Sequence, residues 1–171
     1  MKYAIIENSK VVNIAVSETP LAENWVEAGS AKIGDTWDGE TFTPPPAPSP
    51  TDKNINAERE RRLAAGSAFT VEGVVDPIPL QGRPFDQTVY LALLTRANGL
   101  KSAGVITPAL TLRDGADTIH ELTPDQMISL ISQSMTWFES VMATSWAMKD
   151  GAAPFETGIP ADYTADTHWP E

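Results

Sequence analysis

The chain contains no cysteine among its 171 residues. Disulfide bonds, thiolate zinc sites and cysteine nucleophiles are therefore excluded. Histidine is almost as scarce, and the two copies, His120 and His168, lie in no spacing that would supply several metal ligands. We therefore expect neither a metal site nor a cofactor.

Basic residues are also few. Twelve Lys and Arg residues stand against 23 Asp and Glu residues, which gives a formal net charge of −11. Binding to nucleic acid or to anionic membranes requires Lys and Arg, so we expect neither partner. No apolar run approaches the roughly 20 residues of a membrane span. Glu7 and Asn8 interrupt the first run too early for a secretory signal, so we expect a soluble protein that is not exported by such a signal.

Sequence signatures of catalysis are missing too. No serine lies in a G-x-S-x-G motif, and no glycine-rich phosphate loop is present. Asp114 and Asp117 flank a Gly-Ala pair, but the spacing and the closing Glu of a calcium loop are absent, which favours a simple turn. The sequence therefore predicts a protein that is not an enzyme.

The strongest feature that is present is a helical pattern over residues 123–149. Thr123 is placed to cap this helix, Gln126 completes a capping box, and Gly151 follows as a stop signal. Its apolar residues occupy about half of a helical wheel, which is wider than the stripe of a surface helix. They are Met127, Ile128, Leu130, Ile131, Met135, Trp137, Phe138, Val141, Met142, Trp146 and Met148. This face predicts a central core helix, and the alternative is that part of it also contacts another chain.

Residues 1–43 read as a small antiparallel β module. Two β-rich runs at 2–16 flank Asn8-Ser9, residues 24–28 can form a third strand, and Asp38-Gly39 is a strong hairpin signal. Domains below about 40 residues rarely fold without help. We therefore expect this module to gain stability from another chain, through the free edges of its first two strands.

Residues 44–51 are a proline-rich linker, because PPPAPSP suits neither a ladder nor a helix interior. The pattern of residues 52–150 predicts a mainly helical domain. It begins with a helix that ends at Gly66 and carries a solvated charged run at 58–62. A strand at 67–73, a helix capped by Asp86, a hairpin at 109–122 and the long helix complete the domain. Residues 151–171 are expected to form an extended C-terminal tail, and the fold class is α+β.

Two stretches of the chain resemble known families. The pattern from NAERERRLAAG through GRPFDQTVYLALLTRA to the LTPDQ helix resembles a domain of unknown function found in the tail region of phages. MKYAIIENSKVVNIAV and IGDTWDGETFTPPP are similar to the leading module of phage tail-fibre and tail-fibre-assembly proteins. Members of the first family often carry a Trp in the hairpin, where this chain has Leu110 and Leu112.

The resemblance implies a structural component of the phage tail that binds other fibre or baseplate proteins, with self-association as a further option. The expected location is the virion, after synthesis in the host cytoplasm. Two alternatives remain, a tail-fibre assembly chaperone and an enzyme acting on surface glycans, because a glycosidase carboxylate pair is recognised only in space. We expect partner contacts at large apolar side chains near both ends of the chain: Tyr3, Ile5, Val12, Ile14, Trp25, Trp37, Phe42, Tyr163 and Trp169.

Overall fold

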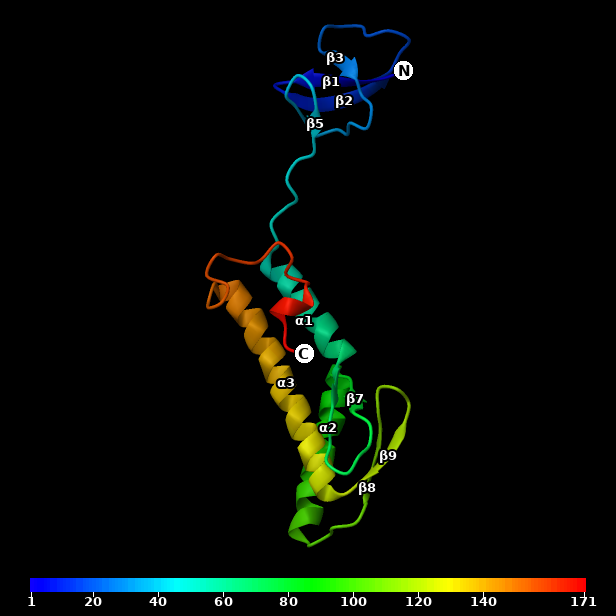
Figure 1. The fold of residues 1–171 in the computed structure, drawn as a ribbon, viewed down its shortest axis with the longest axis vertical. Helices are drawn as coiled ribbons and strands as arrows, with labels where there is room; N and C mark the ends of the chain where they lie inside the picture. Colours follow the sequence, from blue (N-terminus) through cyan, green and yellow to red (C-terminus); the bar gives the residue numbers. More distant parts are fainter. The chain divides into compact units, whose positions relative to one another are not determined.

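The computed structural model describes residues 1–171, which form two compact units, Met1–Pro48 and Ser49–Glu171. The boundary between the units lies within the proline-rich segment. The first unit is an antiparallel sheet, and the second combines three helices with two small hairpins (Figure 1). The predicted α+β class is confirmed.

The N-terminal unit is a five-stranded sheet in the order β3-β1-β2-β4-β5. The strands are β1 (Lys2–Glu7), β2 (Lys10–Val16), β3 (Trp25–Glu27), β4 (Thr36–Trp37) and β5 (Phe42–Thr43). Asn8 and Ser9 take positive φ angles of 49° and 60°, as a tight two-residue hairpin requires. In the second hairpin, a carboxylate oxygen of Asp38 accepts hydrogen bonds from the Glu40 and Thr41 amides.

This sheet buries very little side-chain volume. Its buried hydrophobic residues are Tyr3, Ala4, Val11, Ala28 and Ala31, and three of the five are alanines. Burial of apolar area is the main source of stability, and alanine offers the least of it. The sheet therefore buries little apolar area of its own, as its small size led us to expect.

The second unit holds the remaining elements. These are α1 (Asp52–Ala65), β6 (Ser67–Phe69), β7 (Ile78–Leu80), α2 (Pro84–Ser102), β8 (Leu110–Arg113), β9 (Ile119–Leu122), α3 (Pro124–Asp150) and the short 3-10 helix η1 (Asp166–His168). β6 pairs with β7, and β8 pairs with β9, in two separate antiparallel hairpins.

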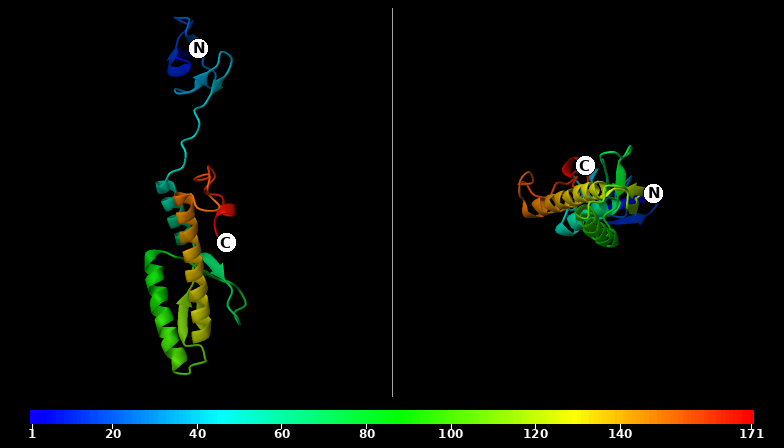
Figure 2. Two further views of the ribbon diagram at one scale, coloured as in Figure 1. Left: turned by 90° about the vertical axis from the view of Figure 1, so that its left-hand side faces the viewer. Right: turned by 90° about the horizontal axis from the view of Figure 1, so that it is seen from below.

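Helix α3 is the spine of this unit. α2 lies along its N-terminal half and α1 along its C-terminal half, and both run antiparallel to it (Figures 1 and 2). Polar contacts join the helices near the two ends of α3. Lys101 Nζ lies 2.6 Å from Asp125 Oδ1, and Lys149 Nζ donates to Asn56 Oδ1 at 3.1 Å.

The ends of α3 match the sequence prediction. The Gln126 amide donates to Thr123 Oγ1 at 3.2 Å, the Thr123 amide donates to Gln126 Oε1 at 3.0 Å, and Gly151 adopts the left-handed conformation. Most of the predicted apolar face packs in the core, with Met127, Leu130 and Val141 among the fully buried residues. Trp146 is the exception to the predicted face, because its side chain is 50% exposed.

Three local predictions were wrong. Asp86 does not cap α2, because the helix begins at Pro84 and places Asp86 in its first turn, where it pairs with Arg83 at 2.7 Å. The predicted strand at 67–73 ends at Phe69. Residues 151–171 are not extended, because they form turns and a short helix that bury Phe155 and Trp169 in the core of the second unit.

Candidate partner-binding surfaces

The outer side of β2 is only partly covered, although the edge strands of the N-terminal sheet are β3 and β5. β2 pairs with β1 along its length, but it meets β4 only opposite Thr36. Backbone bonds extend that side as far as Val11, whose amide donates to the Asp35 carbonyl and whose carbonyl accepts from the Gly34 amide, each at 2.8 Å. No strand covers the outer side of β2 after Val11.

The register identifies the backbone groups on this open side. The Met1 amino group donates to the Ser17 carbonyl at 2.7 Å, and the Ser17 amide donates to the Met1 carbonyl at 3.1 Å. Because inward and outward groups alternate along an antiparallel strand, Ile14 and Val16 direct their amides and carbonyls away from β1. The Ile14 amide is bound by Asn13 Oδ1 at 2.8 Å. The remaining groups are free to pair with an added strand.

Exposed apolar side chains surround this edge. Val12 lies at the bulge of the β1-β2 pairing and is 42% exposed, Val16 is 78% exposed, and Ile33 is 63% exposed. Ile33 precedes Gly34, which is bonded to β2. We call the backbone of Ile14–Val16 together with these three side chains the β2 edge. It includes Val12 and Ile14 of the predicted contact residues.

The other predicted residues of the N-terminal unit lie elsewhere in it. Tyr3 is only 5% exposed, and its ring centroid lies 6.1 Å from that of Trp25. Trp37 and Phe42 stack against each other on paired strands at 4.4 Å. Ile5 is half-buried on β1, which is flanked by strands on both sides. The expectation that the first strand offers a free edge was therefore wrong.

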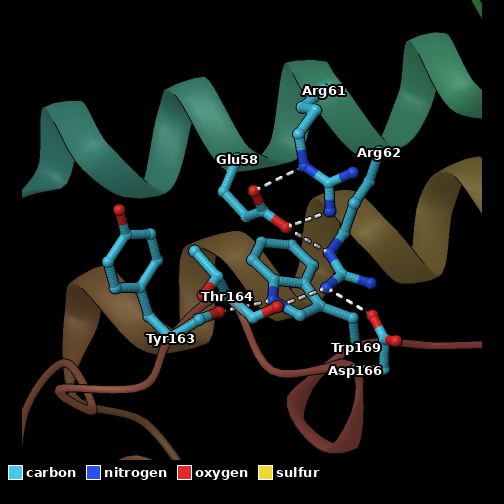
Figure 3. Close-up of polar contacts among 7 residues, drawn as sticks. All are labelled: Glu58, Arg61, Arg62, Tyr163, Thr164, Asp166 and Trp169. Atoms are coloured by element: carbon cyan, nitrogen blue, oxygen red, sulfur yellow. Dashed lines mark hydrogen bonds and ion pairs between the residues drawn. The ribbon is translucent and has the colours of Figure 1, made fainter.

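Tyr163 and Trp169, the two predicted residues near the C-terminus, belong to a network of polar contacts between α1 and the C-terminal residues (Figure 3). We call this network the clamp, and its members are Glu58, Arg61, Arg62, Tyr163, Thr164, Asp166 and Trp169. Trp169 Nε1 donates to the Tyr163 carbonyl at 2.7 Å, and the Trp169 ring is 5% exposed. Arg62 of α1 lies over that ring at 5.0 Å and donates through Nη2 to the Thr164 carbonyl and to Asp166 Oδ1, each at 2.9 Å. Trp169 therefore serves the packing of its own unit.

Glu58 anchors the clamp from α1. It accepts two hydrogen bonds from Arg61, at 2.8 and 2.7 Å, and one from Arg62 Nε at 2.7 Å. Arg61 is the main cause that lowers the pKa of Glu58, against the opposing effect of burial and with help from Arg62. Glu58 is 6% exposed, so the prediction that residues 58–62 form a solvated face was wrong for this residue. Two arginines at i+3 and i+4 were the signal for it.

The two histidines occupy separate structural pairs. His120 Nε2 lies 2.8 Å from Asp114 Oδ2, and His168 Nε2 lies 3.0 Å from Asp162 Oδ1. No group of three or more His, Asp or Glu side chains is arranged to hold a metal ion. No helix is long and apolar enough to cross a membrane.

Comparison with known protein families gives a match over most of the second unit. The family model described as "Domain of unknown function (DUF4376)" matches residues 47–166. This range begins within the proline-rich segment and covers most of the second unit, so the N-terminal sheet lies outside it. No curated protein matches the chain.

Proposed function

The chain belongs to the family described as Domain of unknown function (DUF4376), and we propose that it is a non-enzymatic structural component of a bacteriophage tail. In this role the N-terminal sheet binds another fibre or baseplate protein. The second unit, which carries the family domain, then stays with that partner through the proline-rich segment. The protein acts in the virion, after synthesis in the host cytoplasm.

The β2 edge is the observation that carries this proposal. A strand edge with free amides and carbonyls pairs readily with an extended segment of another chain. Exposed apolar residues beside such an edge add buried area when a partner docks. A sheet whose own core is largely alanine also has the most to gain from that burial.

The proposal that the protein acts in the phage tail depends on the sequence resemblance. MKYAIIENSKVVNIAV, the segment similar to the leading module of tail-fibre proteins, includes all of β1 and β2. The segment that carries the resemblance is therefore also the one that presents the β2 edge. This coincidence supports a partner within the tail.

Mass spectrometry of purified particles tests the proposal. The protein should be present at a fixed copy number, and a genome lacking codons 1–43 should give particles from which the truncated protein is absent. Absence of the intact protein from particles that need it for infectivity would instead indicate an assembly chaperone. Normal incorporation of the truncated protein would place attachment in the second unit.

A point variant gives a finer test of the β2 edge. Val16→Lys should reduce incorporation strongly, because edge lysines oppose strand addition. Leu21→Lys is the matched control, since Leu21 is 72% exposed in the same unit but lies outside the strands. Equal incorporation of the two variants would exclude the β2 edge as the attachment site.

A further inference from the structure

The second unit carries an open strand edge of its own, at β6. β6 pairs with β7 on one side only. Ala68 lies opposite Pro79, which has no amide, and the Pro79 carbonyl accepts from the Gly115 amide at 2.8 Å. The backbone of Pro79 therefore faces away from β6. By the alternation of an antiparallel ladder, the amide and carbonyl of Ala68 face away from β7.

Helix α3 lies beyond this outward side. Gln133 Nε2 donates to the Thr70 carbonyl at 3.0 Å, and Gln126 Nε2 donates to the Glu72 carbonyl at 3.0 Å. Side chains of α3 thus bind two carbonyls of the segment that follows β6. No side chain is bonded in this way to Ala68.

An open hollow of about 770 Å³ lies beside this part of β6 and α3, which also contact each other directly. Ser67, Ala68 and Phe69 line one side of it. Uncharged polar residues of α3, Ser132, Gln133, Thr136 and Ser140, line the other. Pro170 and Glu171 also line this hollow, and they line a second hollow of about 350 Å³ together with Arg61 and Arg62.

Trp137 of α3 lines both hollows, and its indole N–H is a hydrogen-bond donor without an acceptor. Its side chain is 8% exposed, and its indole Nε1 is buried without a hydrogen-bond acceptor. Buried donors without a partner are rare in folded proteins because each one costs stability. Nε1 itself has almost no exposed surface, so a segment in the hollow would contact the Trp137 ring without bonding to this donor.

We propose that this groove binds an extended, uncharged peptide segment of another protein, which adds to β6 as a third strand. An extended backbone offers a carbonyl and an amide on one side at the spacing that suits Ala68. The α3 wall offers hydroxyl and amide groups but no charge, and Glu171 is the charged residue among those that line the hollow, which favours an uncharged segment over an acidic one. The proposal concerns the second unit alone and does not depend on the role proposed for the β2 edge.

Selection from a displayed library of random heptapeptides tests this proposal on the full chain. The wild-type protein should enrich uncharged, β-branched sequences that Ala68→Pro does not enrich. Proline is tolerated on an edge strand whose amide faces outward, so this variant should fold while losing the donor. Ala68→Val keeps the amide and is the matched control, which should enrich the same sequences as the wild type.

Two measurements with the selected peptides, made as synthetic peptides, complete the test. Ala68→Pro should weaken binding about tenfold or more, since it removes one hydrogen bond and obstructs another. Thr136→Arg, on an exposed position of α3, should also weaken binding by filling the hollow. On peptide addition, the indole N–H resonance of Trp137 should shift while that of the exposed Trp146 stays in place. A library that yields nothing, peptides that bind Ala68→Pro equally well, or an unmoved Trp137 resonance would overturn the proposal.

Discussion

Asp114 shows how one buried carboxylate can fix the geometry of a hairpin. Its Oδ1 accepts hydrogen bonds from the Ala116 and Thr118 amides at 2.8 and 2.9 Å, and Oδ2 faces His120. Burial raises the pKa of Asp114, but the bonds from His120 and the two amides outweigh it and leave this pKa below its ordinary value. The turn between β8 and β9 is therefore stabilised by the charged form.

This pKa shift predicts a pH-dependent stability. Because the folded pKa lies below the ordinary value of 3.8, the contribution of Asp114 is complete above that value and is lost as the pH falls through the folded pKa. Asp114→Ala should lower the free energy of unfolding by about 1–3 kcal/mol at neutral pH. Urea unfolding of both proteins between pH 7 and pH 2.5 should show this difference shrinking under acid conditions.

Asp76→Ala is the control for this experiment. Asp76 is exposed, and its substitution should change the free energy of unfolding little. A difference between wild type and Asp114→Ala that stays constant down to pH 2.5 would contradict the assigned role of the carboxylate.

At the scale of elements, the junction between α1 and β6 depends on Gly66. Its φ angle is +78°, and its amide donates to the Arg62 carbonyl at 2.9 Å to close the helix. A Cβ at this position would lie 1.8 Å from the Leu80 carbonyl oxygen of β7. The chain passes from helix to strand here only because the residue has no side chain.

Gly66→Ala should therefore destabilise the second unit severely, by about 3 kcal/mol or more. The added Cβ clashes with backbone atoms of Leu80 and Gln81, which cannot move away as a flexible side chain could. Gly99→Ala is a control with the opposite expected sign. Gly99 lies within α2, and a Cβ added there would meet nothing within 4 Å, so alanine should stabilise the helix by about 0.5–1 kcal/mol. Thermal unfolding followed by circular dichroism measures both, and similar changes in Tm would contradict the account.

At the scale of the whole molecule, the two units differ in what stabilises them. The second unit buries large residues such as Ile55, Leu130 and Met148, whereas the core of the first is mainly alanine. We therefore predict that the first unit unfolds at the lower temperature. Calorimetry of the full chain should show two transitions, and a fragment of residues 49–171 should retain the upper one unchanged. A single unfolding transition whose Tm changes when residues 1–48 are removed would contradict the prediction that the two units unfold independently.

The sequence by itself determined the elements whose signals are local. Periodicity and the Thr123 to Gln126 capping box located α3 to within a residue, because a helix and its cap depend on residues at most four positions apart. The Asn8-Ser9 and Asp114-Gly115 turns located two hairpins for the same reason. The proline-rich segment marked the boundary region, because proline excludes both helix interior and ladder.

Only the tertiary structure decided how distant segments meet. Glu58 is buried beside Arg62, which also reaches residues 164 and 166, a contact across about a hundred positions that the local pairing of Glu58 with Arg61 and Arg62 does not record. The same applies to β3, which pairs with β1 rather than extending the sheet beside β2, and so leaves the β2 edge open. The groove between β6 and α3 likewise exists because packing places Trp137 and Gln133 beside an edge about 65 residues earlier in the chain. Strand neighbours, burial of charge and surface hollows depend on long-range packing, which outweighs local propensity wherever the two compete.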